Sequence, residues 1–262
     1  MHPEGPTHSA DVAAASWIRP RLATDFGTVG SVVPAGYPAY ARLLHPVEDG
    51  ERLRRWSDVA AETGRTVHPL VQWHRLVGAV DPRGASDGQG AGPPRVGELV
   101  PDHLAALLDV LAGHTGTPDD CWACVWEGYA WVAKVPGSIA LLAFSDDGEP
   151  PVPEHGPPGF TAEQLAGPRL DHPDRSYLLL RGPLTSFRFI GDQVTADWFD
   201  PQSPNLWWPA DRTWCVGTEI DFDSTLVAGS RALVDDLLAH PVLEALEVQP
   251  GDSLTWDADE VN

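Results

Sequence analysis

Two cysteines, Cys121 and Cys124, are spaced as C-x-x-C, the spacing used for disulfide exchange and for zinc ligation. A disulfide-exchange site needs its first thiol at a helix N-terminus, and no strand-helix-strand pattern surrounds this pair. If residues 121–126 form a strand, the two thiols point to opposite faces and cannot easily share one ion. We therefore expect buried structural cysteines, with no metal and no cofactor. The zinc alternative would draw its further ligands from the following residues: His68, His74, His114 and Cys215.

The second candidate for chemistry is the hexapeptide Asp221 to Leu226, which reads DFDSTL. It resembles the first motif of haloacid dehalogenase-like phosphotransferases, where the first Asp attacks phosphorus, the second is the general acid and oxygen ligands hold Mg²⁺. The resemblance implies Asp221 and Asp223 as catalytic candidates. That family also requires a downstream lysine, whereas the only lysine of this chain, Lys134, precedes the motif. A strand end followed by a turn accounts for the same residues without catalysis.

Tryptophan is unusually frequent, with eleven in 262 residues. Trp207 and Trp208 precede a proline and, with Trp198 and Trp214, are candidates for an aromatic binding platform. Because they are adjacent, they cannot easily face the same way, and we expect one of them to be exposed. The alternative is that both fill the core.

Acidic residues dominate the charge, with 38 Asp and Glu against 17 Lys and Arg and a net charge of −21. Such a chain repels nucleic-acid phosphates and anionic lipids and favours a basic protein partner. The excess is greatest from Val216 onward, which makes Asp257 and Asp259 candidate contact residues beside Trp207 and Trp208.

The location is expected from three negative features. The N-terminal residues lack the basic start and apolar core of a secretory signal, and no apolar run approaches the ~20 residues of a membrane helix. An odd number of cysteines argues against a disulfide framework. We therefore expect a cytoplasmic protein with no membrane partner.

Apolar spacing predicts the elements that would position these residues. Leu104, Leu107, Leu108 and Leu111 form one stripe, which predicts a helix from Asp102 to Gly113. Two other helices are expected at Ala39–His45 and Ser230–Leu238. A further helix is expected to begin near Asp49 and end at Gly64, with its apolar face formed by Leu53, Trp56, Val59 and Ala60. The expected strands are 121–126 (with a helix as the alternative), Ser138–Phe144, Tyr177–Leu180, Ser186–Ile190 and Trp214–Phe222.

The order of these elements predicts an α+β fold, with a mostly antiparallel sheet and helices packed chiefly on one side. Residues 1–16 are small and polar and are expected to be flexible, so the domain spans 17–262. Residues 82–97, rich in Gly and Pro, are expected to form a mobile loop or, alternatively, a boundary between two domains. Residues 145–176 are expected to be a long irregular excursion.

Two stretches, Gly30–Pro46 (GSVVPAGYPAYARLLHP) and Ser203–Asp221 (SPNLWWPADRTWCVGTEID), carry a further resemblance. With CWACVWEGY between them, the chain resembles a family of uncharacterised proteins from high-GC bacteria. It is also loosely similar to the SUKH superfamily of bacterial immunity proteins in its acidity and element order. The sequence thus favours a non-catalytic protein-binding module, regulatory or immunity-like. The alternative is a Mg²⁺-dependent phosphotransferase or phosphatase that uses Asp221 and Asp223.

Overall fold

The computed structural model describes residues 2, 4–50, 52–79, 92–133, 158–172 and 175–262. Its strands are β1 (Thr7–Ser9), β2 (Ala39–Leu44), β3 (Val47–Asp49), β4 (Arg52–Arg54), β5 (Cys121–Trp126), β6 (Leu170–His172), β7 (Arg175–Gly182), β8 (Gly191–Gln193), β9 (Phe199–Pro201), β10 (Leu206–Pro209), β11 (Cys215–Gly217), β12 (Ser224–Gly229) and β13 (Glu244–Val248). Its helices are η1 (Val12–Ala15), η2 (Arg19–Arg21), α1 (Val29–Val32), α2 (Trp56–Thr63), α3 (Trp73–Leu76), α4 (Pro101–Ala112), α5 (Ala162–Ala166), η3 (Leu184–Phe189) and α6 (Arg231–Leu238).

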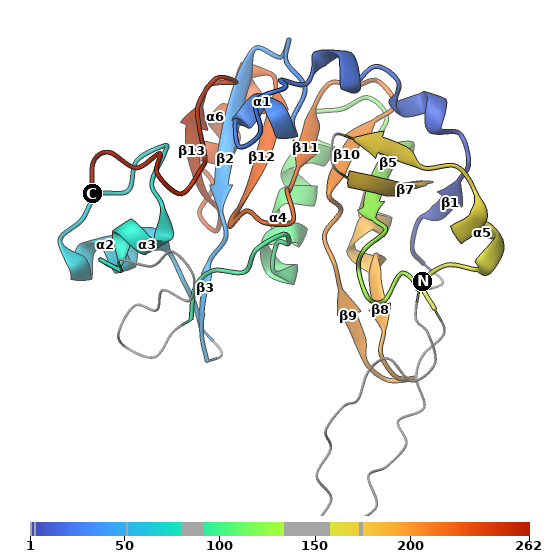
Figure 1. The fold of residues 1–262 in the computed structure, drawn as a ribbon, viewed down its shortest axis with the longest axis horizontal. Helices are drawn as coiled ribbons and strands as arrows, with labels where there is room; N and C mark the ends of the chain where they lie inside the picture. Colours follow the sequence, from blue (N-terminus) through green and yellow to red (C-terminus); the bar gives the residue numbers. More distant parts are fainter. Residues whose placement is uncertain (1, 3, 51, 80–91, 134–157, 173–174) are drawn as a thin grey trace, which may run out of the picture.

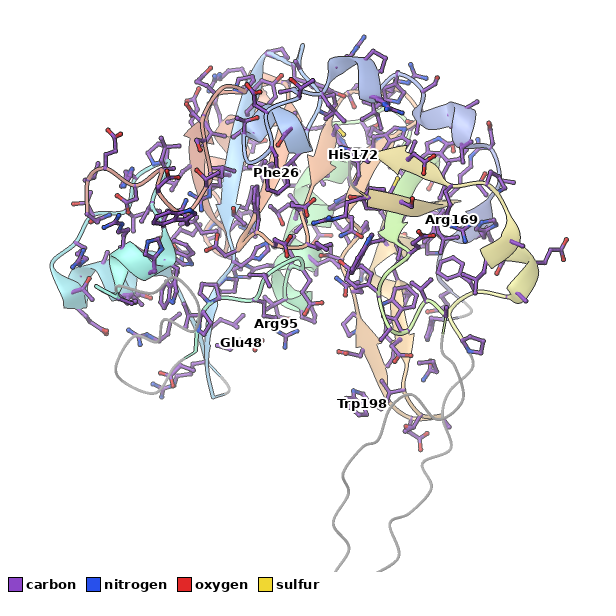
Figure 2. All side chains as sticks on the ribbon, viewed as in Figure 1. Phe26, Glu48, Arg95, Arg169, His172 and Trp198 are labelled. Atoms are coloured by element: carbon purple, nitrogen blue, oxygen red, sulfur yellow. The ribbon has the colours of Figure 1, made fainter. Side chains whose placement is uncertain are left out.

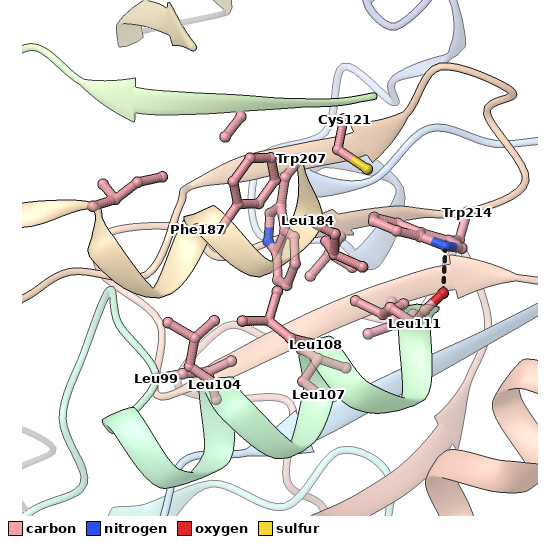
Figure 3. Packing of buried hydrophobic residues seen from close by; sticks show 14 of the residues in the cluster. Leu99, Leu104, Leu107, Leu108, Leu111, Cys121, Leu184, Phe187, Trp207 and Trp214 are labelled. Atoms are coloured by element: carbon pink, nitrogen blue, oxygen red, sulfur yellow. Dashed lines mark hydrogen bonds between the residues drawn. The ribbon is translucent and has the colours of Figure 1, made fainter. Parts of the chain in front are cut away.

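Nine of the described strands form one antiparallel sheet in the order β1-β7-β5-β10-β11-β12-β2-β13, with β6 also paired to β7. One face packs on α4, α6 and η3 around the largest apolar cluster. Figure 3 shows Trp207 and Trp214 over the leucines of α4, where Trp214 Nε1 donates to Leu111 O at 3.2 Å. The fold is the expected α+β class, a mostly antiparallel sheet with its longer helices on one side.

The second face of the sheet is covered mainly by N-terminal segments rather than by long helices. Ala15, Ile18 and the partly buried Trp17 pack on the strands β5, β7, β10 and β11, while Val29 and Val33 pack on β2 and β12. Figure 1 shows α2 and α3 beside the sheet edge formed by β2 and β13. There, Trp56, Val59 and Leu76 form a separate small cluster with Leu44.

Several expected elements are confirmed. The leucine stripe lies on α4, α2 ends at Gly64 in the left-handed conformation, and Ser230 caps α6 through its side chain. Residues 121–126 are a strand, and the expected strand at Tyr177–Leu180 is the centre of β7. The expected strand Ser138–Phe144 lies outside the described residues, as do residues 82–91 of the expected loop and residues 145–157 and 173–174 of the expected excursion.

Three expected elements are wrong. Ala39–His45 is the strand β2 rather than a helix, because Ala39, Ala41 and Leu43 face one cluster while the alternate residues face the other side. The helix expected from Asp49 begins only at Trp56, since a hairpin of β3 and β4 precedes it. Ser186–Ile190, expected as a strand, belongs to η3 and its C-terminal end.

Three other expectations hold only in part or fail. Of the strand expected over Trp214–Phe222, only Cys215–Gly217 pairs as β11. The expectation that residues 1–16 are flexible is wrong for their described part from Thr7 onward, because Thr7–Ser9 pair with β7 and Ala15 is 1% exposed. The excursion after 145 contains α5 and β6 within its described part.

A cavity between two apolar clusters

A cavity of about 490 Å³ opens on the second face of the sheet. Its position follows from the alternation along β2. Tyr40 packs in the cluster beneath the N-terminal segments and Leu44 in the cluster beneath α2 and α3, while Arg42 lies between them. The two apolar clusters therefore leave a gap where the polar side chain of Arg42 stands, and this gap is the floor of the cavity.

Arg42 is 1% exposed and almost fully hydrogen-bonded. Its Nε donates to Ser224 Oγ at 3.0 Å, and Nη1 donates to the carbonyls of Pro69 and Val71 at 3.1 and 2.8 Å. Its Nη2 donates to Asp223 Oδ1 at 3.3 Å. Removing either member of such a buried ion pair strongly destabilises a fold. The pair of Arg42 and Asp223 therefore stabilises the structure at the base of the cavity.

Asp223 and Asp221 both line this cavity. Burial raises the pKa of Asp223, and the positive charge of Arg42 and its hydrogen bond oppose that rise. Asp221 is more open, with 67% of its side chain exposed, and its Oδ2 accepts from Arg175 Nη2 at 2.9 Å. The structure thus brings both carboxylates of the DFDSTL motif to one cavity and pairs each with an arginine.

One wall is the C-terminal segment, with Leu254, Thr255 and Trp256. Leu254 N donates to Gly27 O at 2.7 Å, which ties this wall to the N-terminal residue Phe26. Gly27 has φ +85°, and a Cβ there would lie 2.5 Å from Thr255 Cγ2. Only glycine permits this close approach and backbone conformation, so Gly27 places Phe26 beside the C-terminal wall.

The C-terminal segment is anchored by Asp259. Its Oδ1 accepts from His68 Nε2 at 2.8 Å and its Oδ2 from Gln72 N at 3.2 Å. The backbone amides of Val261 and Asn262 and the side-chain amide of Asn262 also donate to it. Burial alone would raise the pKa of Asp259, but these hydrogen bonds outweigh it and hold the pKa well below its ordinary value.

Aromatic side chains form the rim. Phe26 is 63% exposed and lies 6.3 Å from the ring of Phe222, while Trp256 is 61% exposed and lies 6.5 Å from the ring of His74. Val96, 57% exposed, adds an apolar contact from the segment that precedes α4. Burial lowers the pKa of His74, with a smaller contribution from Arg75, so its ring is neutral at pH 7.

The other candidate residues lie elsewhere. Trp207 and Trp208 are 0% and 1% exposed, on opposite faces of β10, so the expectation that one of them is exposed is wrong. Both faces of the sheet are covered, and each ring therefore enters the core. Asp259 is 4% exposed and is an anchor rather than a surface charge, whereas Asp257 is exposed beside Trp256.

Cys121 and Cys124 lie on opposite faces of β5, each fully buried. Burial raises the pKa of Cys121 to about 12, and it also raises the pKa of Cys124 and of Cys215. Such thiols stay protonated at neutral pH and react slowly. Among the described residues, no group of three or more His, Cys, Asp or Glu side chains is arranged to hold a metal ion.

Sequence reasoning missed Arg42, Phe26 and Trp256, and it considered His74 only as a zinc ligand. A signal for Arg42 was available, because it is the only charged residue in an otherwise apolar hexapeptide. No local signal identifies Phe26 and Trp256 as neighbours, since they meet only through contacts between the two ends of the chain.

No helix in the described part of the chain is long and apolar enough to cross a membrane. No family model, no curated protein sequence and no solved structure matches the chain. The family resemblances drawn from the sequence therefore stay expectations.

Proposed function

We propose that this protein is a protein-binding module that holds a basic partner at the cavity rimmed by Phe26 and Trp256. The observation that carries the proposal is the exposure of these two rings, more than half of each, at the mouth of one hollow. Large exposed apolar groups around a concavity are characteristic of interaction sites, because leaving them in water is unfavourable. Aromatic residues also supply most of the affinity at protein interfaces.

The net charge of −21 supports a basic partner. Charges of one sign over a surface raise the association rate of an oppositely charged protein, and the effect falls as salt screens them over about 8 Å. The rim carries part of this charge, since Asp221 lines the cavity and Asp257 follows Trp256.

The phosphotransferase alternative is less well supported by the same geometry. The charge of a transferred phosphoryl group must be neutralised, yet the only lysine of the chain precedes the motif, and Arg175 and the buried Arg42 are already paired with Asp221 and Asp223. We expect no Mg²⁺-dependent hydrolysis of p-nitrophenyl phosphate above a no-enzyme blank. Mg²⁺-dependent turnover that disappears in Asp221→Asn would establish the enzyme instead.

The binding proposal is tested by selecting peptides from a random displayed library against the whole protein. Trp256→Ala is the test variant and Trp198→Ala its matched control, because Trp198 is 52% exposed at the end of the β8–β9 hairpin, away from Phe26 (Figure 2). Selected peptides should be rich in basic residues, bind Trp198→Ala as they bind wild type, and lose at least about tenfold in affinity to Trp256→Ala. Peptides that bind Trp256→Ala undiminished would place the site elsewhere.

A further inference from the structure

Each exposed or partly exposed ring at the cavity, Phe26, Phe222 and Trp256, has an acidic neighbour in the sequence. Phe26 follows the exposed Asp25, Phe222 lies between Asp221 and Asp223, and Trp256 precedes the exposed Asp257. These pairs come from three segments that are far apart in the sequence, and Phe26, Phe222 and Trp256 all line this cavity. Each ring is therefore next to a carboxylate along the chain.

Two arginines of the described residues stand at the cavity, and each is paired with a carboxylate. Arg42 is the arginine that lines it, and its guanidinium donates to Ser224, to two carbonyls and to Asp223. Arg175 reaches Asp221 but shares its charge with the buried Glu219 at 2.8 Å. The cavity thus offers ring faces, and the network beside them holds three carboxylates, Asp221, Asp223 and Glu219, against the two guanidiniums of Arg42 and Arg175.

We propose that the cavity receives an arginine side chain of the partner protein, with its guanidinium on the ring of Trp256 or Phe26 and within reach of the carboxylates of Asp221 and Asp223. This inference rests on the proposed function. The face of an aromatic ring attracts a cation, and a guanidinium stacks on it while it donates in its own plane to carboxylates. Lysine is a compact and strongly hydrated charge, which loses more on entering a ring-lined cavity.

The size of the cavity agrees with this occupant. About 490 Å³ lies within the range of small-ligand pockets, and it exceeds what one side chain fills, so backbone of the partner enters with it. The flanking Pro93 and Val96 then contact that backbone beside the arginine.

Isothermal titration calorimetry with four blocked tripeptides tests the inference. The series Ac-Gly-Xaa-Gly-NH₂ carries arginine, citrulline, lysine or glutamate at Xaa. Citrulline keeps the shape of arginine without its charge. We expect the arginine peptide to bind at least about tenfold more tightly than the citrulline and glutamate peptides, and more tightly than lysine. Added NaCl should weaken it.

Variants connect that binding to the cavity. Trp256→Ala and Phe26→Ala each remove an exposed ring, and Asp221→Asn removes a charge that is 67% exposed, so the fold should survive all three. Each should weaken the arginine peptide, while Trp198→Ala leaves its affinity unchanged. A thermal melt of each variant shows that it is folded.

The outcomes separate this inference from the function on which it rests. The arginine assignment would be overturned if the citrulline or the lysine peptide bound as tightly as the arginine peptide. It would also be overturned if the glutamate peptide bound more tightly than the arginine peptide. The proposed function would stand in those cases if library peptides still required Trp256. If the variants at Trp256, Phe26 and Asp221 bound the arginine peptide with wild-type affinity, the inference would be overturned. If the library peptides bound Trp256→Ala with wild-type affinity, the inference and the proposed function would both be overturned.

Discussion

Asp257 and Asp259 look alike in the sequence but have opposite environments, and the difference predicts opposite mutational effects. Asp259 is 4% exposed and accepts hydrogen bonds from His68, Gln72, Val261 and Asn262. Asp257 is exposed and accepts from the neighbouring Thr255 side chain. Asp259→Ala should therefore loosen the C-terminal wall of the cavity, whereas Asp257→Ala should leave stability unchanged within error.

The magnitude for Asp259→Ala follows from its partners. A hydrogen bond to a charged group contributes about 1.5–3 kcal/mol. The amides of Val261 and Asn262 lie at the chain end and can turn to water, so we count only the bonds from His68 and Gln72. Two bonds at the lower value give a loss of about 3 kcal/mol. In a protein of this size that loss lowers Tm by about 6–12 °C.

Urea unfolding of wild type, Asp257→Ala and Asp259→Ala, followed by circular dichroism, measures the difference. The slope of free energy against urea must be the same in all three for the comparison to hold. Equal stability of the two variants would refute the assignment of Asp259 as the anchor of the C-terminal segment.

The pH dependence gives a second readout of the same anchor. Because the folded pKa of Asp259 is depressed, its contribution is fully present above the unfolded value of about 3.9 and is lost as pH falls below it. Below about pH 4, wild type should therefore lose stability more steeply than Asp259→Asn. Parallel acid profiles for the two proteins would contradict this.

Three further predictions concern buried groups. Burial lowers the pKa of His45 and of His103 to about 4, so the unfolded chain takes up protons below pH 6.5 that the folded protein does not. Each residue should therefore lower stability by about 1.4 kcal/mol per pH unit, and His103→Gln should reduce the slope of stability between pH 6 and 5 by about that amount. An unchanged slope would count against this assignment. Trp207→Ala should cost about 4 kcal/mol in urea unfolding because the ring is fully buried against Phe187 and Trp214, and a cost below about 1 kcal/mol would contradict that packing. The three cysteines, all buried, should react with a thiol reagent only after denaturation, so rapid native labelling would show that they are accessible.

The sequence predicted the elements whose apolar spacing is regular. The leucines of α4 and of α6 fall on one helical face each, and no other feature of the chain competes with that signal. The strand β2 was mistaken for a helix because all six of its residues are buried, which hides the alternation that marks a half-exposed strand. Its position between β12 and β13 depends on tertiary contacts, which the sequence of this hexapeptide alone does not reveal.

The candidate site was predicted only in part. Asp221 and Asp223 do line the cavity, because a motif at the start of β12 stays together in space. The tryptophan pair failed as a surface site because adjacent residues in a strand point to opposite faces, and both faces here are covered. The rim was missed because Phe26 and Trp256 are brought together by hydrogen bonds between chain ends, which no local spacing reveals.

The location of the bound arginine peptide tests the central claim most directly. Eleven tryptophans give eleven indole N–H signals in a ¹⁵N correlation spectrum, and the Trp256 signal is identified by its absence in Trp256→Phe. On titration with Ac-Gly-Arg-Gly-NH₂, we expect the Trp256 signal to shift most and the Trp198 signal to keep its position. A saturable titration in which Trp256 does not move while Trp198 or another indole does would contradict it.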